Sequence, residues 1–320
     1  MTKFTAAVVQ TASVAFDPDA TVAKVDVFTK QAADKGARLV VFPEAFVGGY
    51  PKGLDFGARV GGRTAAGRDT FRIYYDGAID VPGPHTRRLG EIAASHGVHL
   101  VIGVIERDGG TLYCTVLFFA PDGNLLGKHR KLMPTASERL IWGYGDGSTL
   151  PAFDTPLGKV GAVICWENYM PMLRMTMYAK GVSLYCTPTA DSRETWLPTI
   201  RHIALEGRCF VLSACQFTRR SDYPADYPID GDVTPDTILM SGGSCIVNPL
   251  GELLTERVFD RDAVLTAEID LDDVARGKFD FDVAGHYARP DVFRLMVNDA
   301  AQPPMQNSTA VFGLNAQLPD

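Results

Sequence analysis

The sequence lacks the features that identify secreted and membrane proteins. Its six cysteines form no C-x-x-C pair, and most of them lie in apolar, strand-like stretches. We therefore expect reduced thiols in a cytoplasmic protein, with no disulfide framework. No apolar run is long enough to cross a membrane, and the run near the N-terminus is broken by Gln10 and Thr11, unlike a signal peptide. The sequence predicts no association with a membrane.

An excess of basic residues is also missing. The chain of 320 residues has 31 Lys and Arg against 38 Asp and Glu, which gives a formal net charge of −7. The one basic block, KHRK from Lys128 to Lys131, is too short for the electrostatic footprint of a nucleic-acid-binding protein. Its first three residues are compatible with a solvated basic face, but Lys131 is not. We predict no nucleic-acid partner.

Short apolar runs alternate with helical patterns along the whole chain. Hairpin signals, such as the turn PDGN at residues 121–124, stand between some of the apolar runs. This succession predicts an α/β fold with mixed sheets. The expected strands are 4–9, 38–42, 99–105, 113–120, 125–129, 159–164, 182–187, 209–214, 243–247, 253–259 and 263–269. The expected helices are 22–32, 86–96, 171–180 and 196–207.

The chain contains no linker that would separate two domains and no repeat at a solenoid period. We therefore expect a single domain over residues 1–275. The tail over residues 276–320 is weakly patterned. We expect it to be a C-terminal extension that forms an interface or is partly disordered.

Three reactive side chains directly follow predicted strands: Glu44, Lys131 and Cys165. In open α/β sheets, ligands and reacting groups collect at strand ends. A carboxylate, an ammonium and a thiol gathered there would supply a base, a positive stabiliser and a nucleophile. Each residue also has a structural interpretation, as a helix-start carboxylate, a solvated strand end and a core thiol, respectively. Periodicity alone does not show that the three meet.

Longer blocks around these residues resemble the nitrilase superfamily of carbon–nitrogen hydrolases, and more narrowly the true nitrilases. The main blocks are FPEAFVGGYPKG (residues 42–53), GKHRKLMPTASERLIWGYGDGS (127–148) and GAVICWENYMP (161–171). Weaker support comes from RHIALEGRCFVLSACQ (201–216) and GGSCIVNPLGE (242–252). The resemblance implies a four-layer α-β-β-α sandwich of the nitrilase type. It also implies that protomers pair through helices, so we expect a homodimer or a higher homo-oligomer.

The resemblance assigns a role to each of four residues. Glu44 matches the general base, Lys131 the catalytic lysine, Glu138 the second glutamate of the site and Cys165 the nucleophile. No metal ion or other cofactor is required. Candidates for lining the substrate pocket are Tyr50, Thr135, Trp142, Trp166 and Pro188, each of which has a structural alternative because aromatic and apolar residues line pockets and cores alike.

The function that follows is hydrolysis of an organic nitrile to the carboxylic acid and ammonia, through a thioimidate and a thioester on the cysteine. Trp166 and Glu167 directly after the cysteine, and the block IWGYGDGS after Glu138, favour a nitrilase. An amidase or N-carbamoyl amidohydrolase of the same superfamily shares the four residues and is the alternative. A catalytically silent scaffold for partner binding is the alternative from a different class.

Overall fold

The side chains of the central strands point alternately into two apolar layers. In β1 (Lys3–Gln10), Ala6 and Val8 belong to a cluster that joins the two large sheets, while Ala7 and Val9 belong to a cluster shared with helices. Successive residues of a strand face opposite sides of the sheet. A strand that is apolar on both sides must therefore be covered on both faces. The computed structural model, which describes residues 3–229, 231–303 and 305, has such a layered arrangement.

The first sheet has seven strands in the described part of the chain. Its order is β14-β1-β2-β4-β5-β6, and β3 pairs with β4. The strands from β1 through β2 to β4 are parallel, whereas β14, β5 and β6 pair antiparallel with their neighbours, so the sheet is mixed. Besides β1, its strands are β2 (Ala37–Val41), β3 (Ile79–Asp80), β4 (His99–Asp108), β5 (Thr111–Phe119), β6 (Leu125–Arg130) and β14 (Ala263–Asp270).

The second sheet has five strands in the described residues, in the order β13-β10-β9-β8-β7. Its centre is parallel and both edge strands are antiparallel. One face packs against the first sheet, because residues of both sheets share one apolar cluster. Its strands are β7 (Phe153–Thr155), β8 (Gly158–Ala162), β9 (Leu184–Thr189), β10 (Phe210–Cys215) and β13 (Cys245–Val247).

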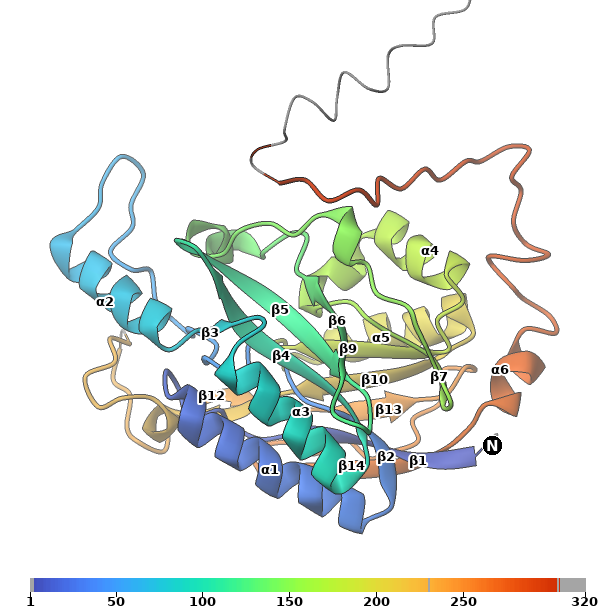
Figure 1. Ribbon diagram of the computed structural model, residues 1–320, viewed down its shortest axis with the longest axis horizontal. Coiled ribbons are helices and arrows are strands. Elements are labelled where there is room, and N and C mark those ends of the chain that lie inside the picture. Colours follow the sequence, from blue (N-terminus) through green and yellow to red (C-terminus); the bar gives the residue numbers. More distant parts are fainter. Residues whose placement is uncertain (1–2, 230, 304, 306–320) are drawn as a thin grey trace, which may run out of the picture.

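Helices cover the outer face of each sheet. The helices α1 (Pro18–Asp34) and α3 (Pro84–His96) pack on the first sheet, and α4 (Pro171–Ala179) and α5 (Trp196–Gly207) pack on the second. The start of α1 is capped by Asp17, whose carboxylate accepts a hydrogen bond from the Ala20 N–H group at 2.9 Å. The predicted four-layer α-β-β-α sandwich is confirmed (Figure 1).

The strand predicted over residues 253–259 is wrong. Leu253 and Phe259 each form only an isolated bridge, with Val247 and Gly242, and the described residues between them have no ladder partner. An apolar run forms a strand only where a neighbouring strand offers a free hydrogen-bonding edge. Here the run serves as a connection between β13 and β14.

Several short or weakly apolar elements were not predicted. They are α2 (Ala65–Asp76), α6 (Asp272–Gly277), the short strands β3 and β7, and β11 (Phe217–Arg219) with β12 (Ile238–Ser241), which form a two-stranded sheet. The helix α2 buries only Gly67 and Tyr74, while Phe71 and Tyr75 on the same face are partly buried, so its apolar stripe is short.

The segment after α6 runs along the outside of the sandwich (Figure 1). Most of its side chains are exposed over residues 286–303, and the Gln302 N–H group donates to Asp146 Oδ2 at 2.8 Å. The rest of the predicted extension, residue 304 and residues 306–320, lies outside the described residues. Among the helices described, none combines the length and apolarity that a membrane span requires.

Candidate active site

Strand ends from both large sheets meet at one point. Glu44 follows β2 and Lys131 follows β6 in the first sheet, whereas Cys165 follows β8 in the second. Lys131 Nζ donates to Oε1 of Glu44 at 2.6 Å and to Oε2 of Glu138 at 2.8 Å. Glu138 comes from the short 3₁₀ helix η1 (Ala136–Leu140). The convergence that periodicity could not demonstrate is therefore present in the fold.

The Cys165 thiol contacts Thr189 and is influenced by the charge of Glu44. Thr189 Oγ1 donates to the sulfur at 3.1 Å, and burial and the charge of the Glu44 carboxylate both raise the pKa of the thiol. Oε2 of Glu44 is buried and, within the described residues, accepts no hydrogen bond in favourable geometry. This oxygen is therefore available to accept a proton from the thiol.

The backbone at the site adopts a conformation that side chains disfavour. Cys165 has a φ of +50°, Ala45 after Glu44 has +49°, and Ala136 at the start of η1 has +47°. Residues other than glycine seldom adopt the left-handed region, and such strain persists only where the surrounding structure holds it. Three such residues lie at one place. The fold therefore holds a particular arrangement of side chains here at the cost of local backbone strain.

Burial and charge set the protonation of the three central groups. Burial raises the pKa of Glu44 above its ordinary value, although the Lys131 charge opposes this. Burial likewise raises the pKa of Cys165 well above its usual range, and the Glu44 charge adds to the effect. Burial by itself lowers the pKa of Lys131, but the charges of Glu44 and the neighbouring acids outweigh it and hold the pKa well above its usual range. The resting site therefore contains a protonated thiol, a protonated amine and a carboxylate more basic than an exposed glutamate.

Glu138 is held by donors on both of its oxygens. Tyr50 Oη donates to Oε1 at 2.7 Å, and the Thr135 N–H group donates to Oε2 at 2.6 Å. Together with Lys131, these donors fix the direction of the carboxylate. The Lys131 ammonium is also 5.4 Å from the centre of the Trp142 ring, a cation–π distance. The amine is thus held from several sides.

A cavity of about 190 Å³ opens above the thiol. Tyr50, Thr135 and Trp166 line it, as does Glu138. Trp142 and Pro188 are not among the described residues that line it, and their role at the substrate pocket stays a prediction. Trp142 is buried, and its indole N–H group donates to Tyr74 Oη at 3.1 Å. Its ring therefore packs beside the Lys131 ammonium without being among the described residues that line the cavity. Pro188 lies within the buried strand β9 and pairs with Ala214 of β10.

Several residues of the pocket wall were not predicted from the sequence. Asp191 accepts a hydrogen bond from the Trp166 indole at 2.9 Å and binds Arg193 through both carboxylate oxygens at 2.8 and 2.6 Å. The Arg193 guanidinium also stacks 4.9 Å from the Trp166 ring centre. Lys52 and Ser192 complete this side of the cavity. The only signal in the sequence is the polar run DSR directly after an apolar strand, which is common in loops.

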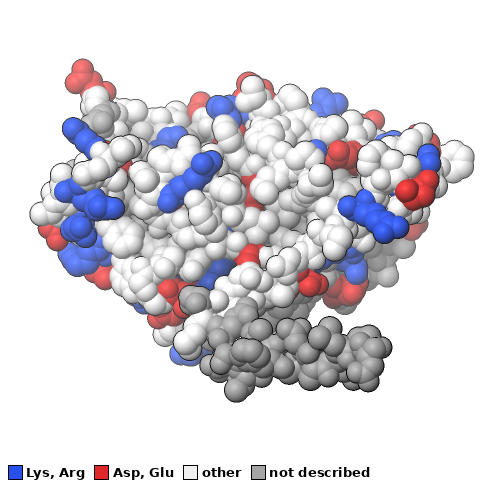
Figure 2. All heavy atoms as spheres, turned by 90° about the horizontal axis from the view of Figure 1, so that it is seen from above, with Lys and Arg blue, Asp and Glu red and all other residues white. Residues whose placement is uncertain are grey.

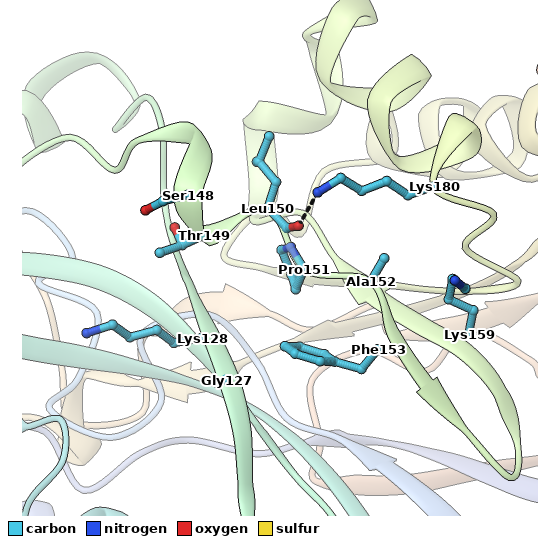
Figure 3. A pocket seen from close by; sticks show the side chains of 10 residues that line it. All are labelled: Gly127, Lys128, Ser148, Thr149, Leu150, Pro151, Ala152, Phe153, Lys159 and Lys180. Atoms are coloured by element: carbon cyan, nitrogen blue, oxygen red, sulfur yellow. Dashed lines mark hydrogen bonds between the residues drawn. The ribbon is translucent and has the colours of Figure 1, made fainter. Parts of the chain in front are cut away.

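A larger hollow of about 540 Å³ lies elsewhere, where the loop before β7 meets β6 (Figure 3). Lys128, Lys159 and Lys180 are among the residues that line it, and the Lys180 amine donates to the Leu150 carbonyl at 2.7 Å. Each of the three ammonium groups is engaged, since Lys128 binds Glu106 and Lys159 binds Asp154. Size alone therefore does not identify the functional cavity, and the smaller one contains the reactive groups.

The basic block KHRK does not form a solvated face. His129 is fully buried, so that interpretation is wrong for this residue, and Lys128 and Arg130 bind the buried carboxylate of Glu106. On the face seen in Figure 2, basic and acidic side chains are interspersed, with no continuous patch of one sign.

Comparison with known proteins agrees with this geometry. The carbon–nitrogen hydrolase family model matches residues 5–279. A nitrilase of Bradyrhizobium diazoefficiens is 58% identical over 98% of this chain and 97% of its own length. A bifunctional nitrilase/nitrile hydratase of Nicotiana tabacum is 57% identical over 94% of this chain and 87% of its own.

A solved structure shares the fold at low sequence identity. The C. elegans NitFhit protein matches with a TM-score of 0.72 and 21% identity, over 95% of this chain and 69% of that one. The family match spans most of the chain, and the identity to the curated relatives exceeds half of all residues. The chain belongs to the carbon–nitrogen hydrolase family and, within it, to the nitrilase branch.

Proposed function

We propose that this protein is a nitrilase, which hydrolyses an organic nitrile to a carboxylic acid and ammonia. The observation that carries the proposal is the buried contact of Lys131 with Glu44 and Glu138, beside the Cys165 thiol at the floor of a cavity. The names of the two curated relatives support a nitrile as the substrate. The small cavity of about 190 Å³ favours small nitriles, since sites for drug-sized ligands typically measure ~300–1,000 Å³.

In the first step, the Cys165 sulfur attacks the nitrile carbon while Glu44 takes the thiol proton. A thiol is mostly protonated at neutral pH, and burial increases this tendency here. A base positioned to remove the proton during attack typically contributes ~10²–10⁴ in rate. The new C–S bond and the loss of one C≡N π bond place negative charge on the nitrogen. Lys131 and the Trp166 N–H group, in the first turn of η3 (Cys165–Tyr169), meet this charge.

The resulting thioimidate takes up a proton on nitrogen and is then attacked by water. Glu44 removes a proton from that water, a tetrahedral intermediate forms, and ammonia leaves after protonation, which produces a thioester. A second water attacks the thioester, and the carboxylic acid leaves as the thiol is restored. Two waters are consumed, and one acid and one ammonia are released. Glu138 holds Lys131 in place throughout, with Tyr50 and Thr135 fixing Glu138 in turn.

The tetrahedral intermediate has two leaving groups, and their competition decides the product. Loss of ammonia leads to the acid, whereas loss of the thiolate releases an amide. One relative is named for both nitrilase and nitrile hydratase activity. We propose that the acid is the main product here, because Lys131 lies beside the reacting nitrogen and favours its departure as ammonia.

A panel of aliphatic, aromatic and arylacetonitriles, each assayed beside its matching amide, tests the proposal. We expect ammonia release from at least one small nitrile, faster than from its amide. Faster amide turnover would instead establish an amidase. Cys165→Ala should abolish release, while Cys209→Ala, at another buried cysteine in the core beneath α5, should retain it. Hydrolysis that survives Cys165→Ala would refute the mechanism.

We further propose that residues 1–275 form one catalytic domain that self-associates in the cytoplasm, and that residues 276–320 form an extension contributing to the interface. All six cysteines are free and buried, which suits a reducing compartment. Exposed apolar side chains support self-association: Met172 of α4, Leu205 of α5, and Phe293 and Met296 of the extension. Light scattering coupled to size-exclusion chromatography should give the mass of a dimer or larger assembly, and a monomer mass would contradict this.

A further inference from the structure

His129 and Glu167 form a fully buried pair that the proposed mechanism does not use. His129 Nε2 lies 3.1 Å from Glu167 Oε2, and both side chains are 0% exposed. The other ring nitrogen, Nδ1, lies 2.6 Å from the Thr149 carbonyl oxygen. The ring therefore bridges the Thr149 carbonyl and the Glu167 carboxyl group, one through each nitrogen.

The Glu167 carboxylate also binds two backbone N–H groups. The Leu132 N–H group donates to Oε1 at 2.5 Å, and the Ile164 N–H group donates to Oε2 at 2.9 Å. Leu132 directly follows Lys131, and Ile164 directly precedes Cys165. One carboxylate thus holds the peptide units next to two residues of the proposed site.

These two peptide units belong to different layers of the sandwich. Lys131 follows β6 of the seven-stranded sheet, while Cys165 follows β8 of the five-stranded sheet. Apolar side chains between two sheets tolerate small sliding, because dispersion contacts have little direction. Charge-assisted hydrogen bonds are short and directional. The packing of the two sheets alone therefore leaves the distance between Lys131 and Cys165 poorly defined. The hydrogen bonds of the Glu167 carboxylate restrict this distance.

We propose that Glu167 is a positioning residue that sets the separation between Lys131 and Cys165, with His129 as the buried hydrogen-bonding partner that holds its carboxyl group in place. The proposal rests on the nitrilase function proposed above. Glu167 does not touch the reacting atoms, and acts through the backbone on either side of them. A misplacement of about 1 Å between reacting groups can lower a rate by ~10²-fold.

The decisive variant is Glu167→Gln, which keeps the shape but replaces one oxygen by an NH₂ group that faces donors. We expect kcat to fall by ~30–100-fold, with KM changed by less than about threefold, because the groups that bind substrate are untouched. Glu167→Asp retains the charge and should restore part of kcat. Alkylation of Cys165 by iodoacetamide, followed by mass spectrometry, should slow in Glu167→Gln, since the alignment of the thiol with Glu44 is also lost.

The matched control is Glu106→Gln, at an equally buried carboxylate that binds the side chains of Lys128 and Arg130 on the opposite face of β6. We expect this control to lower the melting temperature while leaving kcat and the alkylation rate within about twofold. If Glu167→Gln does not fold, His129→Gln replaces it, with a smaller expected loss of kcat because the carboxylate keeps its backbone donors.

The outcomes separate the two proposals. Unchanged kcat and alkylation rate in the folded variant, or a lowered melting temperature as the sole effect, would overturn the role of Glu167. If the parent enzyme hydrolyses no nitrile, or Cys165→Ala retains activity, the proposed function fails instead. The alkylation rate needs no substrate, so it tests the positioning in that case as well.

Discussion

Strand β6 separates two clusters of charged side chains that differ in exposure and in partners. On one face, Lys128 and Arg130 bind the carboxylate of Glu106, and their side chains are 25% and 19% exposed. We call Lys128, Arg130 and Glu106 the outer cluster. Arg130 also binds the exposed Asp108 and stacks on the Tyr113 ring at 3.9 Å. Each cation of the outer cluster therefore retains some contact with water or with a second partner.

The inner cluster consists of Glu44, Lys131 and Glu138 and lies on the other side. Lys131 and Glu44 are 0% exposed, and two carboxylates share one ammonium. Removing charges from water costs several kcal/mol per ion, and a buried ion pair often gives no net stability. Stability therefore does not explain the inner cluster. Buried groups whose pKa values are shifted, as those of Glu44 and Lys131 are, concentrate at functional sites, which agrees with the proposed chemistry.

The largest expected difference between the clusters is in activity after removal of one carboxylate charge. Glu44→Gln removes the proposed base and should lower kcat by ~10²–10⁴-fold. Glu106→Gln makes the same chemical change in the outer cluster and should leave kcat within about twofold. Steady-state kinetics on a nitrile that the parent enzyme hydrolyses tests both, and comparable losses in the two variants would remove the functional distinction.

The two lysines provide a second matched pair. Lys131→Met removes the positive charge near the developing negative charge on nitrogen, a loss typically worth ~10²–10³ in kcat. Lys128→Met lies three residues away in sequence and faces the outer cluster, so we expect kcat within about threefold of the parent. Circular dichroism should first establish that both variants fold. Retained activity in Lys131→Met would contradict the proposed role of the ammonium.

Removal of the carboxylate from the outer cluster should lower the stability of the protein, although it should leave kcat nearly unchanged. Glu106→Gln leaves Lys128 and Arg130 without their shared carboxylate, and we expect a loss of about 2 kcal/mol in the free energy of unfolding. Urea unfolding at neutral pH measures this loss. A stability equal to that of the parent would mean that the outer cluster, like many surface ion pairs, contributes little.

The pH dependence of activity reports on the inner cluster alone. Glu44 acts as a base only when ionised, and burial raises its pKa above the ordinary value of 4.5. As the pH falls through this raised pKa, Glu44 takes up a proton, and kcat/KM should fall about tenfold per pH unit. The decline should therefore begin at a higher pH than an exposed glutamate would cause. A flat profile down to pH 4.5 would contradict this expectation.

The smallest expected effect concerns Cys114, whose thiol donates to Glu44 Oε1 at 3.5 Å. A donor to the ionised carboxylate stabilises it and lowers its pKa. Cys114→Ala should therefore raise the pKa of Glu44 and shift the acidic limb of kcat/KM upward by ~0.3 pH units. Cys114→Ser provides a stronger donor and should shift the limb downward. Equal profiles for both variants would show that this contact does not tune the base.

The sequence predicted the fold where elements have a strong local pattern. The helix at Trp196–Gly207 was predicted over 196–207, and its buried residues recur at helical spacing. The failures have physical causes. The apolar stripe of helix α2 is short, whereas the run 253–259 is apolar but finds no strand edge to pair with.

The types of reactive residue at the site could be predicted from the sequence. The residues that surround them in the pocket wall were predicted less well. Trp142 and Pro188 stand close to the motifs in sequence, but both are buried and neither is among the described residues that line the cavity. Lys52 and Asp191 lie in loops, where no periodicity indicates the direction of a side chain. Glu167 follows the cysteine by two residues, and its partner His129 is 38 residues away, so their pairing carries no local signal.

The sequence by itself determined the succession of strands and helices and the chemical types available at the strand ends, because hydrophobic periodicity and residue identity are local properties. Only the tertiary structure decided which of these side chains meet. Glu44 and Lys131 come from one sheet and Cys165 from the other, and the pleat of β6 sends neighbouring basic residues to opposite faces. Their convergence depends on how two sheets pack face to face, a long-range property that no short stretch of sequence contains.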